Sequence, residues 1–308
     1  MGDQTPSVSG AADVKVARTR PHKAVVVGIS GASSSGKTTL ARLLRDIFPS
    51  TFILHEDDFY KIESELPSKD GLLDWDSFDS LNTENMAKAL AYIRENGTFP
   101  PFVESIEDKN SVGKCPVSDA KIAQMRSRVQ QWLAPGQPGH GLLKAAAAAA
   151  ASTSTSSSSS PSVEAAQPIT TTKPGLKICI LDGFLLYSPE MEAAGILSLL
   201  DIKFFLLVSR AKATQRREAR DGYVTVEGFW TDPPGYVDQI VWPNYVEGHK
   251  WLFEAGDVDG DGKLDKKVLR DKAILAQTGK GGDVDMETTF EWVVETLMHE
   301  LEAIGRSD

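Results

Sequence analysis

The stretch Gly31-Ala-Ser-Ser-Ser-Gly-Lys-Thr38 follows the pattern G-x-x-x-x-G-K-[ST], and both of its flanks agree with a phosphate-binding loop. Before it, the β-branched run over 23–30 predicts one buried parallel strand. After it, apolar residues recur from Leu40 to Ile47 at the i, i+3, i+4, i+7 spacing of a helix. A glycine-serine turn that matches by chance would not explain both flanks. The chain is therefore predicted to bind a nucleoside triphosphate.

The loop has the groups that this chemistry needs. Backbone N–H groups and the positive end of the following helix converge on phosphate oxygens, and Lys37 adds a point charge. The hydroxyl of Thr38 is placed to bind Mg²⁺. We therefore expect ATP and Mg²⁺ as cofactors. The predicted ATP-binding residues of the loop are Gly31, Ser34, Ser35, Gly36, Lys37, Thr38 and Thr39.

The composition excludes several classes of protein. With 41% hydrophobic and 25% charged residues, the 308-residue chain has the make-up of a globular protein. Its net charge of −10 disfavours a role in coating nucleic acid, which needs clustered Lys and Arg. The sequence has no secretory segment, and its most apolar stretch, 196–208, is interrupted by Asp201 and Lys203. We expect small-molecule partners, no membrane contact and a cytoplasmic location, with the nucleus as the alternative.

The pattern along the chain predicts one α/β domain. Strands alternate with helices, which is typical of a parallel sheet covered on both faces. We expect a tail without structure over 1–22 and a single P-loop kinase domain with a small lid over 23–308, like nucleoside and nucleotide kinases. An Ala- and Ser-rich stretch cannot bury an apolar face, so 135–173 is predicted to be a low-complexity insertion without structure.

Acidic residues close two of the predicted strands. Asp182 ends the apolar run 177–182, as the Mg²⁺-holding acid of P-loop enzymes does. Asp57 and Asp58 follow a short strand over 51–55, so one of them could meet the γ-phosphate at the carboxyl edge of the sheet. An acceptor hydroxyl needs such a carboxylate to take its proton. The alternative is that this pair only caps a helix.

Arg216, Arg217 and Arg220 share one predicted helix. A solvated basic face is the usual explanation of such a run, but a phosphate site needs positive charge over the developing γ-phosphoryl group. We therefore favour a lid role, with Arg217 as an alternative ligand of the acceptor's hydroxyls. The run 257–265 is similar to a calcium loop, but Val268 stands where that loop needs a bidentate Glu. We interpret it as a polar surface loop.

Taken together, these residues resemble the nicotinamide riboside kinases of the uridine-kinase-like P-loop group. The resemblance covers about 24–100 and 176–304. Its motifs are the P-loop from Gly28 to Thr39, Asp57-Asp-Phe-Tyr-Lys61, Trp75-Asp76, Asp182-Gly-Phe-Leu-Leu186, Arg216-Arg217, and Pro234-Gly-Tyr236 leading to Val241-Trp-Pro243.

The resemblance implies a role for each matched residue. Asp58 would be the catalytic base for the ribose 5′-hydroxyl and would bind Mg²⁺ together with Thr38 and Asp182. Trp75 would stack on the nicotinamide ring. Arg216 and Arg220 would bind the ATP phosphates. The remaining acceptor site would consist of Phe59, Tyr60, Lys61, Asp76, Arg217 and one or both of Tyr223 and Trp230.

Some features differ from the family or stay open. Asp182 stands where the family has glutamate, the lid over Asp221–Pro233 is longer, and either Tyr223 or Trp230 could be the second stacking residue. The turn that contacts adenine is expected near 277–281. The implied reaction is ATP- and Mg²⁺-dependent phosphorylation of nicotinamide riboside, and of nicotinic acid riboside too, to the mononucleotide for NAD biosynthesis. The alternatives are a uridine or other small-metabolite kinase, and a nucleotide-dependent switch, although no N-K-x-D motif is present.

Overall fold

A computed structural model describes residues 22–110, 113–143, 175–259, 262–277 and 283–307. The predicted tail up to residue 21 and most of the predicted insertion, 144–174, lie outside the described residues. The strands of the main sheet are β1 (Ala24–Gly31), β2 (Thr51–His55), β5 (Lys177–Gly183), β6 (Ile202–Leu206) and β9 (Ile274–Ala276). The α-helices are α1 (Lys37–Ile47), α2 (Thr83–Asn96), α3 (Asp119–Leu133), α4 (Pro189–Ala193), α5 (Arg210–Glu218), α6 (Trp242–His249), α7 (Lys266–Asp271) and α8 (Met286–Ser307).

The central sheet is parallel and has the order β2-β5-β1-β6-β9. Strand β1 is buried along its whole length and pairs with β5 on one side and β6 on the other. A β-branched strand without polar alternation suits this position, because both of its faces are covered. The strands β5 and β6, which follow one another in the chain, therefore lie on opposite sides of β1. In such sheets, ligands bind in the crevice at the carboxyl end of the strand where the order reverses.

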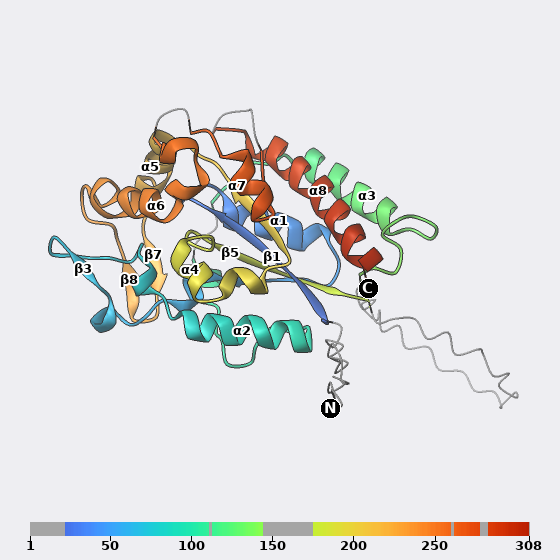
Figure 1. Cartoon of the computed structure of the whole chain (residues 1–308), viewed down its shortest axis with the longest axis horizontal. Helices are drawn as coiled ribbons and strands as arrows, with labels where there is room; N and C mark the ends of the chain where they lie inside the picture. The colour runs from blue at the N-terminus through green and yellow to red at the C-terminus, as the bar shows by residue number, and fades with distance from the viewer. Residues whose placement is uncertain (1–21, 111–112, 144–174, 260–261, 278–282, 308) are drawn as a thin grey trace, which may run out of the picture.

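Helices cover the sheet on two sides (Figure 1), and the strand side chains alternate between two cores. Val25, Val27 and Ile29 pack with α1, α3 and α8. Ala24 and Val26 point to the other face and pack with α2, α4, α6 and α7. The amphipathic pattern that predicted α1 is confirmed, because Leu40 and Leu44 are fully buried. The predicted α/β class is confirmed.

The phosphate-binding loop joins β1 to α1, and its glycines are needed for its path. Gly31 and Gly36 have φ values of +148° and +100°, a region that residues with a Cβ rarely adopt. A Cβ on Gly31 would lie 2.4 Å from the carbonyl oxygen of Leu206. The loop can therefore lie against β6 only with glycine at this position.

Two small hairpins stand at the carboxyl end of the sheet. One is β3 (Ser68–Lys69) with β4 (Leu72–Leu73), and the other is β7 (Tyr223–Thr225) with β8 (Gly228–Trp230). The second forms part of the segment predicted to be a lid and is called the lid hairpin below. Short 3₁₀-helices include η1 (Glu56–Phe59) and η4 (Glu107–Lys109), and a π-helical turn, η6 (Val237–Val241), leads into α6.

Helix α6 ends at His249, and a 3₁₀ turn, η7 (Lys250–Leu252), follows it. One local expectation needs correction. The first part of the predicted insertion, 135–143, is packed against the domain, because Leu143 is buried beside α3 and forms a bridge with Leu176. Across the described ranges, none of the helices is both long and apolar enough to cross a membrane.

Candidate active site

A cavity of about 1010 Å³ lies where β1, β2 and β5 end. It is large enough for a drug-sized ligand. Its walls combine phosphate-loop side chains, carboxylates, arginines and aromatic rings. They include Ser33, Ser34, Gly36, Lys37, Thr38, Thr39, Asp57, Tyr60, Trp75, Asp76, Glu107, Asp182, Arg216, Arg217, Arg220, Tyr223 and Trp230.

At one end of the cavity the P-loop has the donors of a phosphate site. Lys37 is buried, and its Nζ donates to the carbonyl oxygen of Ala32 at 2.8 Å. Burial lowers the pKa of this lysine, and the charge of Asp182 opposes that shift. The hydroxyl oxygens of Ser34 and Ser35 are buried without a hydrogen-bond partner among the described residues. Buried polar groups are normally satisfied, so these hydroxyls fit a loop that closes around an anion.

Asp182 is held between a hydroxyl and an imidazole. It accepts a hydrogen bond from Thr38 Oγ1 at 2.5 Å, and its other oxygen lies 2.5 Å from Nδ1 of His55. Burial lowers the pKa of His55, but the carboxylate of Asp182 outweighs this and raises it to about 9. Asp182 is buried as well, yet the positive charge of His55 keeps its pKa below the ordinary value. The charged pair therefore holds the carboxylate beside Thr38.

The two adjacent aspartates, of which Asp58 is the predicted base, point to different places. Asp58 Oδ1 accepts hydrogen bonds from the backbone N–H groups of Ile106 at 2.7 Å and Glu107 at 3.0 Å, and it is not among the described residues lining the cavity. Asp57 does line the cavity. Both residues are in the 3₁₀-helix η1, whose tight turn directs successive side chains apart. The sequence pattern by itself does not show which of the two aspartates faces the cavity, whereas the structure does.

Asp57 has the electrostatic surroundings of a proton acceptor. Burial, together with the charges of Glu107 and Asp182, raises its pKa to about 7, and the charge of Lys37 opposes this shift. A carboxylate with a pKa near 7 can accept a proton at neutral pH. In the described part of the chain, no three His, Cys, Asp or Glu side chains lie close enough to hold a metal ion directly. The donor set instead fits Mg²⁺, which keeps several waters and binds through one or two protein oxygens and phosphates.

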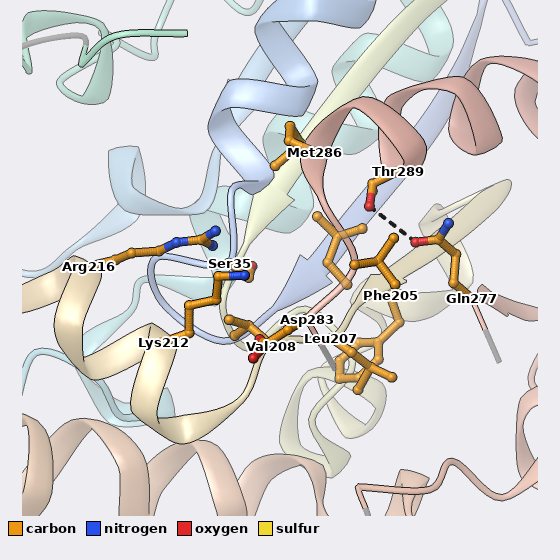
Figure 2. Close-up of a pocket in the computed structure, with 12 residues that line it drawn as sticks. Ser35, Phe205, Leu207, Val208, Lys212, Arg216, Gln277, Asp283, Met286 and Thr289 are labelled. Atoms are coloured by element: carbon orange, nitrogen blue, oxygen red, sulfur yellow. Dashed lines mark hydrogen bonds between the residues drawn. The ribbon is translucent and has the colours of Figure 1, made fainter. Parts of the chain in front are cut away.

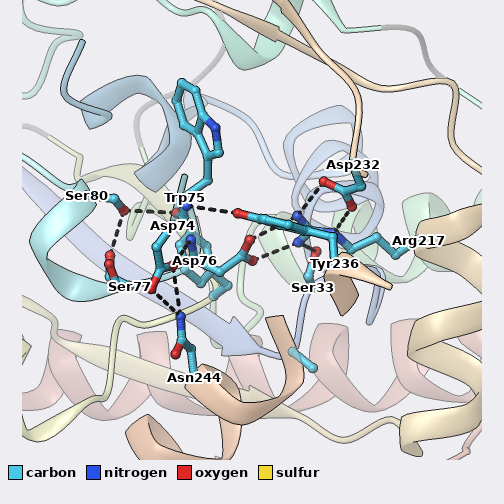
Figure 3. Close-up of polar contacts among 12 residues, drawn as sticks. Ser33, Asp74, Trp75, Asp76, Ser77, Ser80, Arg217, Asp232, Tyr236 and Asn244 are labelled. Carbon is cyan, nitrogen blue, oxygen red and sulfur yellow. Dashed lines mark hydrogen bonds and ion pairs between the residues drawn. The ribbon is translucent and has the colours of Figure 1, made fainter. Parts of the chain in front are cut away.

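At the other end of the cavity, Arg217 joins two carboxylates (Figure 3). Its guanidinium donates to both oxygens of Asp76, at 2.7 and 2.9 Å, and to both oxygens of Asp232, at 2.6 and 3.2 Å. It also donates to Ser33 Oγ at 3.0 Å, so it reaches the P-loop. Paired, bidentate contacts of this kind fix the position of a side chain. The arginine and Asp76 therefore form a rigid polar wall.

Aromatic rings lie beside this wall. Trp75 and Trp230 both line the cavity, with ring centroids 5.7 Å apart and planes inclined by 49°. Tyr60 meets Trp75 edge to face at 5.2 Å. Tyr223 instead lies beneath the guanidinium groups of Arg220, at 4.4 Å, and Arg217, at 5.2 Å. Of the two residues left open by the sequence, Trp230 is the one beside Trp75.

Of the other two arginines, Arg216 lies over the P-loop, whereas Arg220 follows the end of α5 and lines the large cavity. Arg216 donates to the carbonyl oxygen of Ser34 at 3.2 Å and lines both the large cavity and a smaller one of about 30 Å³. Figure 2 shows Arg216 on one side of the smaller cavity, and Thr289 hydrogen-bonded to Gln277 on the other. Gln277 begins the turn expected to contact adenine, while 278–281 lie outside the described residues.

Several predicted residues lie elsewhere. Phe59 is buried in the core, and Lys61 donates to the carbonyl oxygen of Asp79; neither is among the described residues lining the large cavity. Their motif covers a 3₁₀ turn, so only some of its side chains face the ligand. In the calcium-like run, Asp259 accepts from Trp242 Nε1 at 2.7 Å, and Asp265 caps α7.

Sequence reasoning missed two carboxylates, Glu107 and Asp232. Glu107 is buried and lines the cavity, but its segment has no motif. Asp232 is in the lid segment, where an acid that follows three arginines is a signal the sequence offers. Glu107 is recognisable only once the fold brings it to the site.

The chain is similar to curated nicotinamide riboside kinases along most of its length. It is 32% identical to that of Schizosaccharomyces pombe over 280 residues, which cover 91% of this chain and 99% of the relative. Identity to the Saccharomyces cerevisiae enzyme is 30% over 278 residues, covering 90% and 96%. Nicotinamide riboside kinase 1 of Rattus norvegicus is 27% identical over 226 residues, covering 73% and 78%. No family model matches the chain.

Proposed function

Since this chain belongs to the nicotinamide riboside kinase family, we propose that it transfers the γ-phosphoryl group of ATP to the 5′-hydroxyl of nicotinamide riboside. The observation that carries the proposal is the composition of one cavity. A phosphate loop lies at one end, and a buried Asp–Arg pair with two tryptophans lies at the other. Such a cavity can hold a phosphate donor and a ribosylated aromatic cation at the same time.

The chemical step needs a base next to the phosphate loop, and we assign this role to Asp57. Its carboxylate lines the cavity, and its pKa is about 7. The 5′-oxygen attacks the γ-phosphorus, its proton passes to the carboxylate, and the bond to the β-phosphate oxygen breaks to release ADP. Such a reaction needs little covalent chemistry from the protein, so positioning and charge stabilisation supply most of the acceleration.

Thr38 and Asp182 would hold Mg²⁺, which neutralises charge on the phosphates when it is bound. Asp182 already lies 2.5 Å from Thr38 Oγ1, so a small shift would free both oxygens for the ion or its waters. Lys37, Arg216 and Arg220 would add positive charge over the transferred group. Arg216 is close enough for this, because it already contacts the backbone of Ser34.

The acceptor would be bound through its ribose and its ring. Asp76 and Arg217 would hold the 2′- and 3′-hydroxyls, since both line the cavity. The carboxylate can accept further hydrogen bonds, and Arg217, whose five N–H groups bond to Asp76, Asp232 and Ser33, would exchange one of these bonds for a hydroxyl. The positively charged pyridinium ring would lie against Trp75 and Trp230, where cation–π attraction contributes about 0.5–2 kcal/mol. Nicotinic acid riboside has the same ring and ribose, and we propose it as a second substrate.

The test is ADP release by the purified protein with ATP and Mg²⁺ and one acceptor at a time. Nicotinamide riboside, nicotinic acid riboside and uridine form the series. We expect turnover with both pyridine ribosides and much less with uridine, which lacks the positive charge. Turnover with uridine alone would contradict the substrate proposed here while leaving the kinase chemistry in place.

A further inference from the structure

A segment outside the family motifs reaches the phosphate end of the cavity. Residues 105–110, called the strap below, lie between α2 and α3 and contain the 3₁₀-helix η4. Asp58 anchors the strap, because its Oδ1 accepts from the N–H groups of Ile106 and Glu107 and lies 3.4 Å from Ser105 Oγ. A carboxylate at the start of a helical turn stabilises that turn through its free N–H groups. Asp58 therefore fixes where the strap crosses the site.

The strap directs Glu107 into the cavity. Its residue exposure is 5%, and it lines the same cavity as Asp57, Asp182 and Lys37. A carboxylate in such a place is costly unless it has partners. Asn110 Nδ2 donates to its Oε2 at 2.6 Å, and Arg42 is 4.0 Å from its Oε1. Among the described residues, the second oxygen thus has a single long contact, with the partly exposed Arg42, and it is available to a ligand.

The strap is also tied to the lid hairpin. Asn110 Oδ1 accepts from the backbone N–H of Val224 at 2.7 Å, while its Nδ2 holds Glu107. One amide therefore links the carboxylate at the phosphate end to the hairpin that presents Trp230. A loop that only covered the surface would not need an amide that bonds to two separate parts of the cavity wall.

We propose that Glu107 is a positioning residue for the Mg²⁺–ATP complex, acting on the water shell of the ion together with Asp57 and Asp182, and that Asp58 holds the strap that places it. The inference rests on the proposed function. Thr38 and Asp182 already offer the one or two protein oxygens through which Mg²⁺ binds beside phosphates, so we place Glu107 on the waters of the ion. Residues that act on a metal from this outer shell typically change its affinity or the activity by about 10- to 100-fold when they are removed.

The test is the affinity of Mn²⁺, which replaces Mg²⁺ and is visible by electron paramagnetic resonance, for the protein saturated with a non-hydrolysable ATP analogue. We expect Glu107→Gln to weaken this affinity by about tenfold or more and to lower kcat, while KM for the riboside stays within twofold. The control is Glu104→Gln, which makes the same change on an exposed side chain just before the strap. We expect it to leave the Mn²⁺ affinity within twofold of the wild type.

Glu107→Asp separates charge from packing. If the charge acts on the ion, the aspartate variant regains part of the Mn²⁺ affinity that the glutamine variant lacks. If Glu107 only packs the strap, glutamine is the better replacement and retains wild-type affinity, which would overturn the inference. A wild-type protein that does not bind Mn²⁺ with the nucleotide would instead contradict the proposed kinase function.

Discussion

Replacing Asp57 by asparagine should mainly lower activity, whereas replacing Asp58 by asparagine should mainly lower stability. Asp57→Asn removes a carboxylate that lines the cavity and that burial holds at a pKa of about 7. General-base catalysis is typically worth about 10²–10⁴-fold, so we expect kcat to fall by that factor. Stability should change little or rise slightly, because a poorly solvated charge is replaced by a neutral amide.

Asp58→Asn should act mainly on stability. The charged acceptor of two backbone N–H groups, at 2.7 and 3.0 Å, becomes a neutral carbonyl oxygen with the same shape. Hydrogen bonds to charged groups contribute about 1.5–3 kcal/mol and neutral ones about 1 kcal/mol, so the loss should be about 1–3 kcal/mol. The base would remain, so the fall in kcat should be at least tenfold smaller than that of Asp57→Asn.

The two variants are compared by ADP release at saturating substrates and by urea unfolding monitored by circular dichroism. The assignment of the base to Asp57 is wrong if Asp58→Asn abolishes turnover at unchanged stability while Asp57→Asn keeps more than a tenth of the wild-type kcat. In that case the orientation described for η1 would not be the one that operates during catalysis.

Three further outcomes follow from the site. Trp230→Ala should raise KM for nicotinamide riboside about 5- to 20-fold. Tyr223→Ala should raise this KM less, since that ring lies under arginines. Initial rates over a series of riboside concentrations measure both KM values. Arg217→Ala leaves the buried carboxylate of Asp76 and the partly exposed one of Asp232 without their guanidinium partner. It should lower the free energy of unfolding by about 3–5 kcal/mol in urea titrations, an unchanged midpoint being the contrary result. Burial raises the pKa of Glu56 from 4.5 to about 8, so the folded protein holds a proton that the unfolded chain releases, and stability should fall as pH rises from 5 to 8. Glu56→Gln should reduce the difference in the free energy of unfolding between pH 5 and pH 8. An equal difference in the variant would contradict the raised pKa assigned to Glu56.

The fold could be predicted because its signals are local. A β-branched strand, a glycine loop and an amphipathic helix in sequence leave few alternatives, and the alternation of strands and helices then implies a parallel sheet. The sequence also identifies four residues that line the cavity, because each belongs to a short motif next to a predicted strand or helix. They are Trp75, Asp76, Asp182 and Arg217.

The remaining parts of the site depend on turns and on long-range packing. Whether Asp57 or Asp58 faces the ligand is decided by the rotation of one 3₁₀ turn, which no periodic pattern encodes. Glu107 reaches the cavity through a loop that Asp58 and Asn110 hold from distant parts of the chain. The choice between Tyr223 and Trp230 follows from the pairing of the lid hairpin. These contacts exist only after the chain has folded.

The most direct measurement is the identity of the product after incubation with ATP, Mg²⁺ and nicotinamide riboside, with mass spectrometry for its mass and ³¹P NMR for the phosphorylated oxygen. We expect nicotinamide mononucleotide, phosphorylated on the 5′-oxygen, at a rate that falls by about 10²–10⁴-fold in Asp57→Asn. ADP formation without a phosphorylated riboside, or phosphate on another ribose oxygen, would contradict this expectation.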